Sequence, residues 1–240
     1  MTLLAIERLE GRHGLLRAFQ DFTLDVAEGE KIALVGANGA GKTMLLRTLA
    51  GVHPASRGRI MLDGIDVTAL PGHRRAALGM ALVPEGRCLF ASMSVEENLR
   101  VAESAGRTGH WNLETVLDAL PQLRPKLRAP ASTLSGGQQQ AVAIGRALIT
   151  NPRVLLLDEV SLGLSPLAVQ SVYDSLERLF SSGTTIVLVE QDLQRATSVA
   201  NRVVCMLEGR IVAVGRAGEM SRDEILDHYF GHRHRSAAHG

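Results

Sequence analysis

The sequence predicts an α/β fold that combines a mostly parallel sheet, a small antiparallel β lobe and an inserted all-helical lobe. Short apolar runs rich in β-branched residues alternate with amphipathic stretches, as in KIALVG followed by KTMLLRTLAG. This alternation is typical of strand–helix units around a parallel sheet. Residues 1–30 and the segment GRIMLDGIDVT instead have the pattern of short strands joined by polar turns, which favours an antiparallel lobe. Residues 94–128 carry helical signals and predict the helical lobe.

Local signals mark several helix boundaries. Ser94, followed three residues later by Glu97, predicts a capping box, in which each side chain bonds the backbone N–H of the other residue. Ser165 is a good helix N-cap, and Pro166 fits the first helical position because a missing N–H costs nothing there. Two glycines fit helix ends, Gly51 and Gly183.

Length and composition predict one globular domain over residues 1–230, with the helical lobe inserted at about 86–134. Of the 240 residues, 45% are hydrophobic and 21% are charged, which is enough apolar material for a substantial core. The formal net charge is +1, so no bulk field draws the chain to nucleic acid or anionic lipid. The tail from residue 231, GHRHRSAAHG, lacks an apolar face, and we expect it to be disordered, with histidines able to bind metal only adventitiously.

The two cysteines, Cys88 and Cys205, have neither a CxxC pair nor a metal-ligand spacing, which argues against a disulfide framework or a zinc site. The N-terminus lacks a basic region followed by a long apolar core, and no apolar run approaches the ~18 to 20 residues of a membrane span. We therefore expect a soluble protein of a reducing cytoplasm that docks on other components.

The segment GANGAGKT matches G-x-x-x-x-G-K-[ST] and lies between a predicted strand and a predicted helix, as in a P-loop NTPase core. Glycines let successive N–H groups converge on phosphate oxygens, Lys42 reaches the β- and γ-phosphates, and the Thr43 hydroxyl ligates Mg²⁺. A chance glycine-rich turn is the alternative, which the strand–helix context disfavours. No N-K-x-D segment follows, so ATP is favoured over GTP. The predicted phosphate-binding residues are Gly36, Ala37, Asn38, Gly39, Ala40, Gly41, Lys42 and Thr43.

The segment VLLLDEV places Asp158 and Glu159 at the carboxyl end of an apolar strand, where ligands bind in open α/β sheets. Consecutive strand residues face opposite ways, so we expect the two carboxylates to have different tasks. Asp158 suits support of Mg²⁺, and Glu159 suits the general base that activates water for attack on the γ-phosphate. A solvated turn after the strand is the alternative.

In LSGGQQQAVAIGRALI, Ser135 and Gln138 predict a capping box that encloses two glycines, Gly136 and Gly137. Each glycine costs a helix roughly 1 kcal/mol relative to alanine, so an ordinary helix start does not explain them. A helix N-terminus without side chains lets an anion approach its N–H groups closely.

This last segment resembles the signature motif of the ATP-binding cassette family. The order of motifs is similar too, with the phosphate loop at 36–43, the signature at 134–138 and the acidic strand at 154–159. In that family two cassettes stack head to tail, and each signature completes the nucleotide site of the other. The resemblance implies that Ser135, Gly136, Gly137 and Gln138 act on ATP bound by a second cassette, and that a monomer is nearly inactive.

Several phrases, among them ALVPEGRCLFASMSVEENL, IVLVEQD and the terminal HYFG, are similar to the ATP-binding subunits of branched-chain amino acid importers. The resemblance implies an ATP hydrolase with ATP and Mg²⁺ as cofactors, peripheral at the cytoplasmic face of the plasma membrane. Its implied partners are a second cassette, identical or related, of which the resemblance favours a related one. They also include transmembrane permease subunits and, indirectly, a substrate-binding protein, with no nucleic acid.

The chain departs from the family pattern at several positions. Glu85 stands where most cassettes carry a glutamine that touches Mg²⁺; a carboxylate can still ligate the metal, and a polar turn residue is the alternative. His13 stands where an aromatic usually stacks on adenine; an imidazole can stack too, and a surface histidine is the alternative. Val160 and Leu164 replace the usual proline and aspartate, and Leu164 puts communication between the two sites in doubt.

Most cassettes also carry a histidine at the end of the strand IVLVEQD, where this chain has Gln191. No histidine occurs between His110 and His228. A carboxamide can donate a hydrogen bond to the γ-phosphate, but it cannot carry a proton. Gln191 is therefore predicted to sense the phosphate while Glu159 does the proton work, and Glu190 is predicted to be a packing or capping residue.

Other functions compete with this hypothesis. The same motor could serve urea, short amides or other amino acids. Soluble cassette ATPases act on ribosomes or DNA ends, but they usually have two cassettes or a long coiled-coil insertion, neither of which is present. A P-loop kinase of small metabolites leaves the glycine pair unexplained.

Overall fold

The computed structural model describes residues 1–180, 183–220 and 224–225, and these residues form two β-sheets. The larger sheet has the strand order β10, β9, β3, β8, β7, β6, and every neighbouring pair except β10–β9 is parallel. The smaller sheet is antiparallel, with the order β2, β1, β4, β5. The strands are β1 (Thr2–His13), β2 (Leu16–Ala27), β3 (Lys31–Val35), β4 (Arg57–Leu62), β5 (Ile65–Asp66), β6 (Met80–Val83), β7 (Val154–Asp158), β8 (Thr185–Val189), β9 (Arg202–Leu207) and β10 (Arg210–Arg216).

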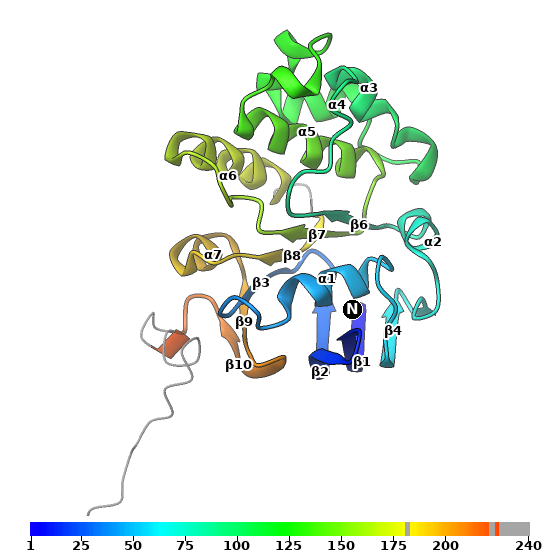
Figure 1. The fold of residues 1–240 in the computed structure, drawn as a ribbon, viewed down its shortest axis with the longest axis vertical. Coiled ribbons are helices and arrows are strands. Elements are labelled where there is room, and N and C mark those ends of the chain that lie inside the picture. The colour runs from blue at the N-terminus through cyan, green and yellow to red at the C-terminus, as the bar shows by residue number, and fades with distance from the viewer. Residues whose placement is uncertain (181–182, 221–223, 226–240) are drawn as a thin grey trace, which may run out of the picture.

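The helices cover the larger sheet and build a separate lobe. In Figure 1, α3, α4 and α5 lie together at the top, β6, β7 and β8 lie in the middle, and β1, β2 and β4 lie at the bottom. The predicted fold class is therefore confirmed: a mostly parallel sheet with an antiparallel β lobe and a helical lobe. The helices are α1 (Lys42–Leu49), α2 (Gly72–Ala77), α3 (Val95–Arg100), η1 (Glu103–Ala105), α4 (Leu113–Ala119), η2 (Pro121–Lys126), η3 (Ala131–Thr133), α5 (Gly136–Ile149), α6 (Pro166–Phe180) and α7 (Leu193–Val199), with η denoting 3₁₀ turns.

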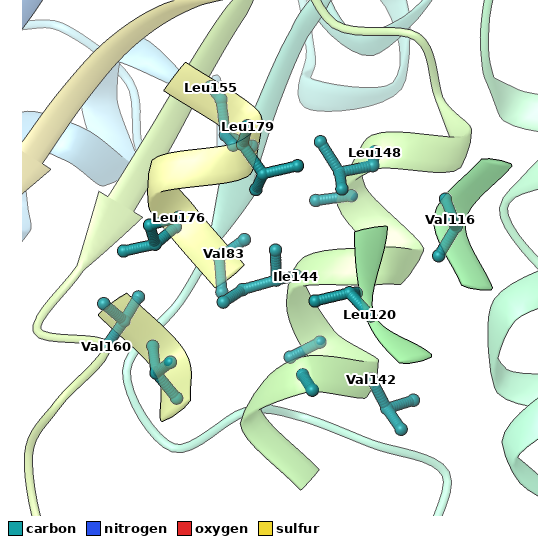
Figure 2. Close-up of a cluster of buried hydrophobic side chains, with 14 of the residues drawn as sticks. Val83, Val116, Leu120, Val142, Ile144, Leu148, Leu155, Val160, Leu176 and Leu179 are labelled. Carbon is teal, nitrogen blue, oxygen red and sulfur yellow. The ribbon is translucent and has the colours of Figure 1, made fainter. Parts of the chain in front are cut away.

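Strand β7 is buried on both faces, because alternate residues point into two different cores. Leu155 packs with Ile144 of α5 and Leu176 of α6 in the core that joins the sheet to the helices (Figure 2). Leu156 packs in the second core, with Leu45 of α1 and the antiparallel lobe. This double burial fixes the carboxyl end of β7 between the lobes, where Asp158 and Glu159 follow.

The predicted caps are present. Ser94 and Glu97 form a reciprocal capping box at the start of α3, as Ser135 and Gln138 do at the start of α5. The Ser165 hydroxyl accepts from the N–H of the third helical residue of α6. These local signals depend on residues three positions apart, which is why the sequence alone reveals them.

Three further expectations concerned membrane spans, the two cysteines and the C-terminal tail. Within the described residues no helix is long and apolar enough to cross a membrane. The two cysteines are free thiols, Cys88 exposed and Cys205 buried. The predicted tail from residue 231 lies outside the described residues.

A buried arginine ties α1, α2 and the β lobe together. Arg75 of α2 is 1% exposed. Its guanidinium donates to the carbonyl oxygens of Thr48 and Leu49 at the end of α1, both at 2.7 Å, and to those of Leu70 and Thr68 at 2.8 and 2.9 Å. The helix dipole places partial negative charge at the C-terminus of α1, so the cation is favoured there.

Arg75→Met should lower the free energy of unfolding by at least about 3 kcal/mol, because each buried carbonyl left without a donor costs roughly 1–3 kcal/mol. Urea denaturation measures the change. Arg74→Met is the matched control, since Arg74 is exposed on the same helix. Equal stability of the two variants would show that the buried guanidinium does not hold these elements together.

Candidate functional site

The loop between β3 and α1 needs glycine at two positions because other backbone atoms approach it closely. A Cβ on Gly36 would lie 2.2 Å from the carbonyl oxygen of Met206, and one on Gly41 would lie 2.4 Å from that of Ala18. Gly41 also has φ of 94°, in the left-handed region that side chains disfavour. The loop therefore turns sharply where it packs against the carbonyl groups of Ala18 and Met206.

Lys42, the first residue of α1, is only 4% exposed. Its Nζ donates to the carbonyl oxygens of Gly36 at 2.6 Å and Ala37 at 3.1 Å. Burial lowers the pKa of Lys42, and the nearby carboxylates of Glu159 and Asp158 oppose that shift. The loop thus encloses an ammonium group that phosphate oxygens can approach from the open side.

Asp158, the last residue of β7, is fully buried. Its Oδ1 accepts a hydrogen bond from the Thr43 hydroxyl at 3.1 Å, and its buried Oδ2 has no hydrogen-bond partner among the described residues. An orphaned carboxylate oxygen beside a threonine hydroxyl is a donor set that suits Mg²⁺, which prefers oxygen ligands. The residues present therefore fit this metal.

Burial raises the pKa of Asp158 to about 6. The hydrogen bond from Thr43 opposes the shift, and the carboxylates of Glu159 and Glu85 add to it. A lone buried carboxylate is destabilising in its charged form, so the metal-free site is unfavourable at neutral pH.

This shift predicts a pH dependence of stability without metal. The folded pKa of about 6 lies above the unfolded value of about 3.9. Between these pH values the folded state therefore binds more protons than the unfolded state. The contribution of Asp158 to the free energy of unfolding is complete below about pH 4 and is lost as the pH rises to about 6. Asp158→Asn removes the titration, so in EDTA at pH 7 it should be more stable than the parent by up to about 3 kcal/mol. Urea denaturation from pH 4.5 to 7.5 measures this; parallel curves for the two proteins would contradict it.

Glu159 lies beyond the end of β7 and has φ of 48°. The expectation from strand alternation does not hold for it, because this left-handed turn, not the pleat, sets the direction of its side chain. Gln191, directly after Glu190 at the end of β8, donates from Nε2 to Glu159 Oε2 at 2.7 Å. Sequence spacing gave no signal for this contact between two strand ends.

The loop, the two strand ends and Glu85 surround one cavity of about 510 Å³. His13, exposed at the end of β1, is not among its lining residues, so adenine stacking by His13 stays a prediction. Ala18, Met44 and Leu162 line the cavity without having been predicted. Ala18 comes from the distant strand β2, whereas Met44 and Leu162 follow Thr43 and Glu159 closely but carry no polar group that signals a site. The lining residues are Ala18, Asn38, Gly39, Gly41, Lys42, Thr43, Met44, Glu85, Glu159, Leu162 and Gln191.

The predicted signature lines a different cavity, of about 720 Å³, between the start of α5 and the start of α6. Within this chain Ser135 through Gln138 do not join the phosphate loop. The glycine pair also has a packing reason that sequence reasoning missed: a Cβ on Gly136 would lie 3.0 Å from Leu164 Cδ2, and one on Gly137 would lie 2.9 Å from the Ala168 Cβ. Both glycines therefore let α6 and the preceding loop approach the helix start.

Comparison with known proteins identifies this arrangement. A family model described as "ABC transporter" matches residues 19–161. The chain belongs to the ABC transporter family. The resemblance inferred from the motifs is thus confirmed, and this ABC chain is an ATPase whose cassette binds ATP and ADP.

Three curated relatives of this ABC chain differ in what their names say they transport. The chain is 37% identical over 232 residues to a high-affinity branched-chain amino acid transport ATP-binding protein, BraG of Pseudomonas aeruginosa, covering 95% of the chain and 100% of the relative. It is 34% identical to a probable branched-chain amino acid transport ATP-binding protein, LivF of Archaeoglobus fulgidus, covering 94% and 97%. It is 31% identical to a putative ribose/galactose/methyl galactoside import ATP-binding protein of Pseudomonas savastanoi pv. phaseolicola, covering 90% of the chain and 43% of the relative.

Solved structures of ATP-binding cassettes share the fold. A nucleotide-free cassette from an ABC transporter superposes with a TM-score of 0.82 at 25% identity, covering 96% of each chain. An ABC transporter cassette in its ADP conformation superposes with a TM-score of 0.79 at 26% identity, covering 95% of this chain and 94% of the other.

Proposed function

We propose that this ABC transporter ATPase powers the import of branched-chain amino acids through separate membrane subunits. The observation that carries the proposal is the match to two branched-chain amino acid transport ATP-binding proteins along almost their whole lengths. We infer that the cargo is captured by a separate subunit, because the cavity that contains Lys42 and Glu159 is the proposed ATP site.

The side chains of the first cavity have distinct proposed roles. Lys42 and the loop N–H groups bind the phosphates of ATP, and Thr43 with Asp158 holds Mg²⁺, with Glu85 as a further oxygen donor at the cavity wall. The metal, when bound, neutralises negative charge on the phosphates. Glu159 takes the proton from the attacking water as general base. Gln191 bonds the Glu159 carboxylate and lines the same cavity as Lys42, and its proposed role is to sense the γ-phosphate as a neutral donor.

The position of the signature supports a second cassette as a partner. Ser135 through Gln138 lie on a cavity separate from the phosphate loop, so we propose that they act on ATP bound by a second cassette, identical or related. Residues 1–230 form the single cassette domain, which docks on permease subunits at the cytoplasmic face of the membrane, while a substrate-binding protein delivers the cargo.

Uptake by a reconstituted complex tests the cargo. The chain, purified from its native membrane together with its bound subunits, is placed in vesicles with ATP and the cognate binding protein, and uptake of labelled leucine, isoleucine or valine is measured. We expect saturable, ATP-dependent uptake that unlabelled leucine competes. Uptake of ribose or galactose instead would replace the proposed cargo by a sugar, which the relative from Pseudomonas savastanoi makes the second candidate.

A further inference from the structure

Glu190 is a buried carboxylate to which the proposed reaction gives no role. It directly follows β8 and is 2% exposed. Its Oε1 accepts hydrogen bonds from the hydroxyls of Tyr173 at 2.6 Å and Ser161 at 2.7 Å, and its Oε2 accepts from the backbone N–H of Gln191 at 3.2 Å. Burial of a carboxylate is costly unless donors compensate it. A residue needed only for packing would be apolar, so the carboxylate itself has a task.

The hydrogen bonds of Glu190 close a ring around the proposed general base. Ser161 lies two residues after Glu159, and Gln191 lies one residue after Glu190. The Gln191 carboxamide donates to Glu159 Oε2 at 2.7 Å, and the Ser161 hydroxyl donates to Glu190 Oε1. The chain therefore runs from Glu159 through Val160 to Ser161, across to Glu190, on to Gln191 and back to Glu159. Val160 is buried in the helical core and anchors one side of the ring (Figure 2).

This ring supplies what the general base lacks by itself. Glu159 has φ of 48°, a sparsely populated conformation that persists only where neighbouring contacts hold it. Its backbone N–H donates to the Val189 carbonyl at 3.1 Å, which fixes the backbone but not the side chain. The carboxylate itself faces an open cavity. Within the described residues, the bond from Gln191 is the hydrogen bond that the structure gives to this carboxylate, beside the electrostatic attraction of Lys42.

We propose that Glu190 is a positioning residue, which through Ser161 and Gln191 holds the Glu159 carboxylate in the orientation that hydrolysis requires. The inference rests on the proposed general-base role of Glu159. Tyr173 bonds the same oxygen of Glu190 from α6 but stands outside the ring. Burial raises the pKa of Tyr173, so its hydroxyl stays a donor. It compensates the buried charge and does not orient Glu159.

Two hydroxyl deletions test whether Glu190 positions Glu159 or is only a buried carboxylate with compensating donors. Ser161→Ala and Tyr173→Phe each remove one hydrogen bond to the same carboxylate oxygen, but only Ser161→Ala opens the ring. We expect Ser161→Ala to lower kcat for ATP about tenfold or more with little change in KM, because small misplacements of a catalytic group are costly. Tyr173→Phe should lower the Tm while kcat stays near the parental value. Phosphate release by the assembled complex gives both constants.

A second readout does not depend on turnover. In the nucleotide-free chain, amide hydrogen exchange at Gln191 should be faster in Ser161→Ala than in Tyr173→Phe, because the open ring no longer holds that strand end. Equal kcat, or equal exchange, in the two variants overturns the proposal.

Substitutions of Glu190 itself decide the matter if Ser161→Ala does not fold. Glu190→Gln keeps an oxygen for Ser161 and should retain more kcat than Glu190→Ala; equal losses overturn the proposal. Glu159→Gln distinguishes a failure of the general-base role of Glu159 from a failure of the positioning role of Glu190. If it keeps the parental rate, the general-base role fails and the positioning role with it. If it abolishes turnover while Ser161→Ala and Tyr173→Phe behave alike, only the positioning role fails.

Discussion

Glu159→Gln is expected to lower ATP turnover by about 10²- to 10⁴-fold while ATP still binds, because a carboxamide cannot accept the proton of the attacking water. The substitution is nearly isosteric, and the Gln191 carboxamide can still donate to its remaining oxygen. The loss should therefore fall on kcat, since the phosphate loop, Thr43 and Asp158 are untouched. Phosphate release measures turnover, and a fluorescent ATP analogue measures binding.

Glu208→Gln is the matched control for this substitution. Glu208 also has φ of 48°, in the exposed turn between β9 and β10, and it does not line the nucleotide cavity. The same change of charge and the same backbone strain are therefore tested away from the phosphates. A rate near that of the parent in Glu159→Gln, or an equal loss in Glu208→Gln, would contradict the general-base assignment.

The sequence predicted those features that depend on neighbours along the chain. The capping boxes at Ser94 and Ser135 need residues three positions apart, and the phosphate loop needs a strand, a run of glycines and a helix in order. Alternating apolar runs were enough to predict a mostly parallel sheet with an antiparallel lobe, because strand and helix periods differ.

Contacts between distant segments could not be predicted in the same way. Glu159 and Gln191 are 32 positions apart, and nothing in either strand end specifies that their side chains meet. The turn at Glu159 also defeated the argument from strand alternation, because φ changes sign where the strand ends. Glu190 was predicted to be a packing or capping residue. It is buried, and its carboxylate also accepts hydrogen bonds from the hydroxyls of Ser161 and Tyr173, which the sequence did not indicate.

The glycine pair of the signature has two explanations, anion binding at a helix start and close packing against α6 and the loop before it. A helix start without side chains was predicted to favour an anion, and the structure adds that a Cβ on Gly137 would clash with the Ala168 Cβ at 2.9 Å, while one on Gly136 would contact the Leu164 side chain tightly at 3.0 Å. Packing explains the glycines but not Ser135. The Ser135 side chain is exposed, and its hydroxyl accepts a hydrogen bond from the Gln138 N–H at the start of α5. A substitution of Ser135 therefore tests the anion-binding explanation without disturbing the packing around the glycines.

Ser135→Arg is expected to leave ATP binding to the chain intact and to lower turnover by at least about 10²-fold, because a long side chain then occupies the surface that meets the nucleotide of a second cassette. In this chain the signature cavity is separate from the phosphate loop, so a change there cannot touch the nucleotide bound by the same subunit. Loss of the cap costs only about 1 kcal/mol, which does not unfold the chain.

Ser94→Arg provides the matched control, since Ser94 caps α3 with the same reciprocal box and lies outside both cavities. Both variants lose one hydroxyl cap and gain one guanidinium. A difference in turnover between them is therefore caused by the surface around Ser135 and not by the loss of a helix cap. Turnover of each variant is measured with its partner cassette, and ATP affinity is measured with the chain alone. Parental turnover in Ser135→Arg, or the same loss in Ser94→Arg, would show that the nucleotide site is complete within one chain.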